Sequence, residues 1–315
     1  MITYNIHELI NSIEPFLAYR SKVGYTRNTT TQSNAADLKL FTGFIDQKDK
    51  HDITGKDVIA FQQYLAICRH NSPASINRKI FTLRAIQNYL ELKGMPGAEQ
   101  LPFKKVLKIR APRPYRANFL EQDDIKKLFS CINRDCVLGL RDYAVYALMA
   151  LLGLRVGEVH RLNLNDIDWY DNIILVKGKC DIERTLYLNN EIKMILENYL
   201  AVLLNIFRAD KTDAFFVSKK GQRMAIRTIE DNFKKLIRTC GIEKHINLTP
   251  HTLRHTCATL LNEKEVRILT IQKILGHTNP NTTIYYYLHT PEHKMREALE
   301  KLPLNVYINQ LINDG

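Results

Sequence analysis

The sequence predicts a mainly α-helical protein in which a four-helix N-terminal unit precedes a larger α+β unit with a small antiparallel sheet. Apolar residues recur every three or four positions through the first hundred residues, a basic segment with several prolines follows, and only two short runs later in the chain resemble strands. With 315 residues, 45% of them hydrophobic and 25% charged, the chain can build two domain cores. We expect a helical domain over 1–100, a linker over 101–118 and a second domain over 119–315 that ends in a tail at 302–315.

The N-terminal helices are predicted by spacing and by their start signals. Within them, apolar residues such as Ile80, Leu83 and Ile86 fall on one face. Thr54 and the pair Ser72-Pro73 precede apolar-periodic stretches, and serine, threonine and proline are typical of helix starts. The expected helices cover residues 6–20, 28–46, 55–69 and 74–93.

The segment after these helices differs in composition. Four prolines lie between residues 95 and 118, and six lysines and arginines alternate with them from Lys104 to Arg116. Such a composition predicts an extended basic linker, which suits contact with a phosphate backbone.

The second unit is expected to mix helices with one hairpin. Helices are predicted near 121–131 and 138–152, and Gly153 then marks a turn. Residues 173–177 and 184–188 read as strands separated by a turn, which predicts an antiparallel hairpin. Helices dominate the rest of the chain.

The charge indicates a polyanionic partner. The net charge is +12, and residues 1–118 hold 18 Lys and Arg against 9 Asp and Glu, whereas the remaining residues hold 27 against 24. Nucleic acid is the first candidate for this partner, and an anionic membrane is a distant second.

Several other classes of protein are disfavoured. The longest apolar stretches, such as Tyr143 to Leu154, are shorter than a membrane span, and the N-terminus lacks the pattern of a signal peptide, so we expect a cytoplasmic protein. The six cysteines form no CxxC pair, which favours reduced thiols over disulfides or a zinc cluster. We expect no cofactor, no metal, no membrane partner and no small-molecule substrate.

A predicted helix start near residue 250 gathers groups suited to an anion. Thr249 is the expected N-cap, and the spacing of three between His251 and Arg254 places both side chains on one face of the first turn. The helix N-terminus adds partial positive charge, which favours a phosphate. His255 suggests a zinc pair with His251, but the glutamate of the HExxH motif is missing.

Further candidates lie in three other places. Gly276 is positioned to end an apolar helix before His277, and three tyrosines, 285 to 287, follow. Arg155 follows the Gly153 turn, and Glu158 is spaced to brace its guanidinium or to cap the turn. Lys179 lies at the expected hairpin tip. Each alone is more often an ordinary surface or core residue.

Together these residues resemble the ordered signature of the tyrosine recombinase (phage integrase) family. The likeness covers about 119–300, and the helical unit is similar in size and position to the family's core-binding domain, as in two-domain Xer-type members. The elements that carry it are Gly153-Leu154-Arg155-x-x-Glu158, a lysine hairpin, His251-x-x-Arg254, Leu275-Gly276-His277 and a tyrosine nine residues later.

The resemblance implies a site-specific DNA recombinase that cuts and rejoins strands through a 3′-phosphotyrosyl intermediate, without ATP or metal. It implies Tyr286 as nucleophile and Lys179 as general acid, with Glu158 and His255 in support. Double-stranded DNA is the implied partner, and a tetramer on two DNA sites the implied assembly. The residues implied to contact the scissile phosphate are Arg155, His251, Arg254 and His277.

Several alternatives stay open. The hairpin departs from the family pattern at Cys180 and Ile182, so Lys177 competes with Lys179 as the general acid. A DNA-binding regulator that has lost cleavage would share the fold, whereas a relaxase would need a His-x-His cluster, and a type IB topoisomerase would act without a specific site. Integration, excision, transposition and chromosome dimer resolution are all compatible with the sequence. The apolar run 302–312 is a hypothetical contact to a neighbouring protomer.

Overall fold

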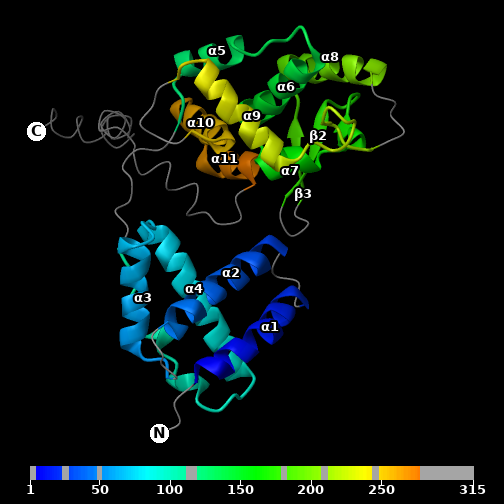
Figure 1. The fold of residues 1–315 in the computed structure, drawn as a ribbon. Helices are drawn as coiled ribbons and strands as arrows, with labels where there is room; N and C mark the ends of the chain where they lie inside the picture. Colours follow the sequence, from blue (N-terminus) through cyan, green and yellow to red (C-terminus); the bar gives the residue numbers. More distant parts are fainter. Residues whose placement is uncertain are drawn as a thin grey trace, which may run out of the picture. The chain divides into compact units, whose positions relative to one another are not determined.

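The protein folds into two compact units, Met1–Pro114 and Tyr115–Gly315 (Figure 1). The computed structural model describes residues 5–22, 28–47, 52–110, 119–178, 183–206, 212–242 and 248–276. Within these ranges, no helix combines the length and the apolar character that a membrane span needs. Lys179, His277, the tyrosines 285–287 and the tail over 302–315 lie outside the described residues.

The first unit contains the four predicted helices, each within two residues of its expected ends, so this part of the prediction is confirmed. Their start signals also form as expected, since Ser72 Oγ accepts a bond from Ser75 N at 3.3 Å and Asp57 Oδ2 accepts one from Thr54 N at 3.0 Å. The elements are α1 (Ile6–Lys22), α2 (Asn28–Asp46), α3 (Gly55–Ile67), α4 (Pro73–Leu92) and the short 3₁₀ turns η1 (Ala98–Gln100) and η2 (Pro102–Lys104).

The core of this unit contains a residue that we expected in the linker. Phe41 packs edge-on against Phe61 at 5.1 Å and against Phe103 at 5.4 Å between ring centroids. Leu101, Phe103 and Val106 are all buried, so residues 101–106 differ from the expected extended linker. These apolar side chains fill a gap between the helices. The prolines and cations of the segment predicted an extended linker, so the sequence pattern did not indicate this packing.

The segment from Ala98 to Ile109, here called the strap, is held along α4 by side chains that bind its main chain. Gln87 Nε2 donates to Leu101 O at 2.8 Å, and Arg84 Nε donates to Phe103 O at 3.1 Å. Asn77 donates to Ile109 O at 2.8 Å and accepts from Ile109 N at 2.9 Å. The strap therefore runs back from the end of α4 to its start.

The second unit surrounds α6 with helices and places the sheet at one side (Figure 1). Buried side chains of α6 pack against α8 and α10, which makes α6 the central helix of this core. The helices are α5 (Gln122–Ser130), α6 (Val137–Leu151), α7 (Val156–Arg161), η3 (Leu164–Asp166), α8 (Asn190–Ile206), α9 (Ile226–Thr239), α10 (Pro250–Glu263) and α11 (Ile268–Leu275).

The sheet has three antiparallel strands in the order β1 (Ile167–Asp168), β2 (Ile173–Lys177) and β3 (Glu183–Tyr187). The predicted hairpin is confirmed, and β1 was not predicted because two residues show no alternation. In β2, Ile174 and Val176 face the core while their neighbours are half-buried. Val176 pairs with Arg184, which brings an arginine of β3 to this end of the hairpin.

Replacement of Phe103 tests whether the strap belongs to the first core. Phe103→Ala should lower the free energy of unfolding of this unit by about 3–5 kcal/mol, since the ring is fully buried. Leu107→Ala is the matched control, because this side chain of the same segment is 84% exposed. Hydrogen exchange of α4 peptides measures the change, and equal exchange in both variants would contradict the packing role.

Candidate active site

The site begins at the turn between α6 and α7, where Arg155 is the N-cap of α7. Its main-chain N donates to Glu158 Oε2 at 2.8 Å, and its Nη1 donates to Glu158 Oε1 at 2.7 Å. Glu158 thus caps the helix and braces the guanidinium at once, as the spacing of three predicted. About 27% of the Arg155 side chain stays exposed, so it can also meet a ligand.

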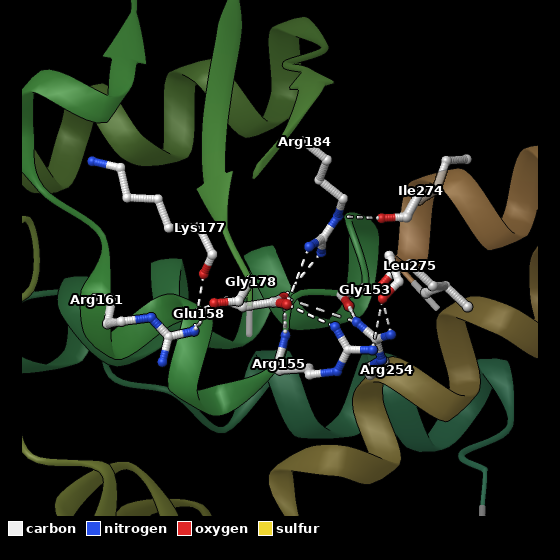
Figure 2. Close-up of polar contacts among 11 residues, drawn as sticks. Gly153, Arg155, Glu158, Arg161, Lys177, Gly178, Arg184, Arg254, Ile274 and Leu275 are labelled. Carbon is white, nitrogen blue, oxygen red and sulfur yellow. Dashed lines mark hydrogen bonds and ion pairs between the residues drawn. The ribbon is translucent and has the colours of Figure 1, made fainter. Parts of the chain in front are cut away.

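The Glu158 carboxylate also binds two arginines from distant segments (Figure 2). Arg184 of β3 donates to it through Nη1 at 3.1 Å and Nη2 at 2.9 Å, and Arg254 Nη1 of α10 lies 3.9 Å from Oε2. The Glu158 side chain is only 1% exposed. One buried carboxylate therefore gathers three guanidinium groups and leaves two positive charges uncompensated within this set. We call Arg155, Glu158, Arg184 and Arg254 the arginine cluster.

The arginine cluster also binds the end of α11. Three successive carbonyl groups accept one bond each: Ile274 O from Arg184 Nε at 2.8 Å, Leu275 O from Arg254 Nη2 at 2.6 Å, and Gly276 O from Arg155 Nη2 at 2.9 Å. The last carbonyl groups of a helix lack partners within it and carry partial negative charge, so cations stabilise them. The chain is thereby held at the residue that precedes His277.

Two glycines allow these groups to approach so closely. Gly153 and Gly276 have φ angles of +64° and +61°, which favour glycine. A Cβ at Gly276 would lie 2.8 Å from Arg184 Nη1, and one at Gly153 would lie 2.4 Å from a methyl carbon of Leu275. The Gly153 carbonyl also accepts a bond from Arg254 Nη1. The close packing around these two positions, and not only their backbone conformation, therefore requires glycine.

Glu158 and Arg254 are both ionised at neutral pH. Burial alone would raise the pKa of Glu158, but the hydrogen bonds and charge of Arg184, together with the Arg155 contacts, lower it to about 2. Burial, and next the charge of Arg155, lower the pKa of Arg254 to about 9, which still leaves this guanidinium charged at neutral pH. An anion entering here at neutral pH therefore meets a charged Arg254.

The two histidines of α10 are biased toward the neutral form. The pKa of His251 is lowered by partial loss of water and by the charges of Arg254 and Arg155, although its side chain keeps considerable exposure. Burial, then His251 and Arg254, lower the pKa of His255 to about 4. An arriving phosphate would oppose these cations and raise the pKa of His251, so His251 is suited to donate a hydrogen bond to that anion. Within the described ranges no group of three metal-ligand side chains gathers.

Of the two candidate lysines, Lys177 lies within the described residues. Its Nζ donates to Asp166 Oδ1 at 2.8 Å, and Figure 2 shows its side chain extending away from Glu158. The hydrogen bond and charge of Asp166 raise the pKa of Lys177. A raised pKa makes an ammonium group a weaker acid. Both this shift and the direction of the side chain therefore disfavour Lys177 as a proton donor to a ligand at the arginine cluster.

The structure thus brings together Arg155, Glu158 and Arg254. On α10, His251 lies three residues before Arg254, and His255 follows Arg254 directly. Sequence reasoning missed Arg184 as a member of the site. Its signal was its place in a half-buried strand, where an arginine needs an acidic partner. A cavity of about 1010 Å³, lined by Arg155, Arg184 and several apolar side chains, opens beside these residues.

Comparison with known proteins adds independent findings. A sequence profile of the phage integrase family matches residues 118–293. Tyrosine recombinase XerC of Caldanaerobacter subterraneus subsp. tengcongensis is 32% identical over 319 residues, which cover 93% of this chain and 87% of the relative. Tyrosine recombinase XerD of Listeria innocua serovar 6a is 29% identical over 304 residues, which cover 94% and 98%.

A solved structure has a similar fold. XerH site-specific recombinase bound to a palindromic difH substrate, in a post-cleavage complex, matches with a TM-score of 0.77 over 95% of this chain and 97% of that chain. The sequence identity is 17%, so this likeness concerns the fold alone.

Glu158→Gln tests the electrostatic role of the buried carboxylate. The folded-state pKa of about 2 lies below the ordinary 4.5, so ionised Glu158 stabilises the fold above pH 5, and this contribution is lost as pH falls toward 2. The variant should be less stable than the parent by about 3 kcal/mol at pH 7, and this difference should narrow between pH 5 and pH 3.

Urea unfolding followed by Trp169 fluorescence measures both proteins at each pH. Glu197→Gln, on an exposed position of α8, is the control and should change little at any pH. A Glu158→Gln deficit that stayed constant from pH 7 to pH 3 would mean that the carboxylate acts through shape and not through charge.

Proposed function

The chain belongs to the phage integrase family and is a tyrosine site-specific recombinase, and on this premise we propose that the arginine cluster binds the phosphate at which a DNA strand is cut. The observation that carries this is the convergence of Arg155 and Arg254, from segments about a hundred residues apart, on one carboxylate beside His251. A phosphodiester carries one negative charge, and a second develops in the pentacoordinate transition state. Fixed guanidinium donors stabilise that added charge.

The proposed reaction uses residues beyond the described part of the chain as well. The phenolic oxygen of Tyr286 bonds to phosphorus and its proton passes to solvent, while the bond from phosphorus to the 5′ oxygen breaks. That oxygen takes a proton from the ammonium group of Lys179. His277, which follows the α11 terminus bound by three arginines, is assigned to the same phosphate. Ligation reverses these steps, so neither ATP nor a metal is required.

Both units are proposed to contact double-stranded DNA, and the working assembly is proposed to be a tetramer on two sites. The exposed cations of the strap, Lys105 and Lys108, supply phosphate contacts in the first unit. Recombination exchanges four strands, which requires four nucleophiles of this kind.

Trapping of the covalent intermediate tests the nucleophile. The protein is incubated with nicked duplexes of randomised sequence, in which release of a short fragment prevents religation, and the adducts are recovered and sequenced. Tyr286→Phe should abolish adducts, whereas Tyr285→Phe and Tyr287→Phe, the flanking controls, should keep them. Arg254→Ala should slow adduct formation by about 10²–10³. Absence of any adduct with the parent protein would contradict the proposed phosphotyrosyl intermediate.

The salt dependence of DNA binding tests the strap cations. Each phosphate contact removed should lower the slope of log K against log salt by about 0.9, so Lys105→Gln with Lys108→Gln should lower it by about 2. Lys104→Gln is the matched control, because Lys104 is already ion-paired with Glu91 and should contribute less. The binding constant is measured by fluorescence anisotropy at several salt concentrations, and an unchanged slope in the double variant would exclude these contacts.

A further inference from the structure

One face of α7 holds both strands of the β2–β3 hairpin at its base (Figure 2). On the β2 side, Arg161 Nη2 donates to Lys177 O at 2.9 Å and to Gly178 O at 3.3 Å. On the β3 side, Glu158 accepts both bonds from Arg184. Positions 158 and 161 are three apart, so their side chains leave the same face of the helix.

The Arg161 contact lies where the strand ladder stops. The last described pair of the hairpin joins Lys177 to Glu183, and Gly178 follows beyond it. The bond to the Gly178 carbonyl therefore restrains the main chain at the last described residue of this arm of the hairpin. Arg161 therefore holds the last two described carbonyl groups on the β2 side of the hairpin.

The same short helix carries the arginine that begins the cluster. Arg155 is the N-cap of α7 and Arg161 is its last residue, so the separation between them is set by six residues, or about 9 Å of helix. The hairpin base is thus placed relative to the proposed phosphate site by one rigid element.

We propose that Arg161 is a positioning residue for the general acid, and that it fixes the hairpin base so that the ammonium group of Lys179 reaches the 5′ oxygen that leaves the phosphate. This inference rests on the proposed function of Lys179. Arg161 itself touches neither the phosphate nor the reacting atoms in this scheme. Its removal should therefore impair proton donation and leave phosphate binding nearly unchanged.

A sulfur atom in place of the leaving 5′ oxygen isolates this step. A thiol has a pKa of about 8.5, far below that of an alcohol, so a thiolate leaves without being protonated. A variant that lacks only proton donation should therefore recover its cleavage rate on the sulfur substrate. A variant that has lost transition-state stabilisation by an arginine of the cluster should not recover.

The probe is the duplex recovered by covalent trapping, synthesised with either oxygen or sulfur at the cleaved 5′ position. The measured quantity is the ratio of the cleavage rate of the sulfur duplex to that of the oxygen duplex in a single turnover. This ratio does not depend on the fraction of active protein, so partial unfolding of a variant does not alter it.

Arg161→Ala is compared with Arg223→Ala as the matched control. Arg223 also donates to two main-chain carbonyl groups near the end of α7, His160 O at 2.9 Å and Leu162 O at 3.2 Å, but none of its described bonds involves the hairpin. Lys179→Ala and Lys177→Ala test the acid itself. Arg161→Lys keeps the charge and can reach one carbonyl group, and it serves as a milder variant should Arg161→Ala not fold.

Arg161→Ala should cut the oxygen duplex about tenfold to a hundredfold more slowly, and the sulfur duplex should relieve most of that loss. Lys179→Ala should lose more activity on the oxygen duplex and should also recover on the sulfur duplex. Arg161→Lys should give a rate ratio between those of Arg161→Ala and the parent. Arg223→Ala and Lys177→Ala should give the same rate ratio as the parent. Relief of Lys179→Ala without relief of Arg161→Ala would overturn the inference alone. Absence of relief in Lys179→Ala would overturn both the assignment of this lysine and the inference built on it.

Discussion

The ion pairs of the buried Glu158 carboxylate are the interaction on which the rest of the arginine cluster depends. Three guanidinium groups, from the start of α7, from β3 and from α10, would repel one another without it. Removal of a charge from water is costly, and the hydrogen bonds from Arg155 and Arg184 offset that cost. The balance leaves excess positive charge in one place, which a protein that acts on phosphodiesters needs before its substrate arrives.

The same arginines connect this charge to the position of the chain after α11. Each binds one of three successive carbonyl groups at the helix end, where the partial charge is negative. The charge of the arginine cluster and the position of the end of α11 are therefore coupled, since a substitution in the cluster also removes a hydrogen bond to the main chain there. Glycine is required there for two reasons: the positive φ is strained for other residues, and the nearby Arg184 leaves no room for a side chain.

Helix α7 is short, but it fixes the positions of three side chains of the site relative to one another. Its N-cap is Arg155, its third residue is the central carboxylate, and its last residue holds the hairpin base. A six-residue helix is stable only when its ends are satisfied, and here the capping bonds and tertiary contacts satisfy them. The proposed phosphate contacts and the proposed proton donor are thereby set on one small frame.

The sequence by itself determined the helices of the first unit, the hairpin, the start of α10 and the end of α11, because these depend on local spacing and on capping residues. It placed Arg155 and Arg254 in one site only through their likeness to a family. Tertiary structure alone decided that Arg184 joins Glu158 and that Phe103 belongs to a core. Both facts depend on contacts between segments far apart in the chain. The charge of a residue or the prolines around it do not specify which distant side chain it will contact.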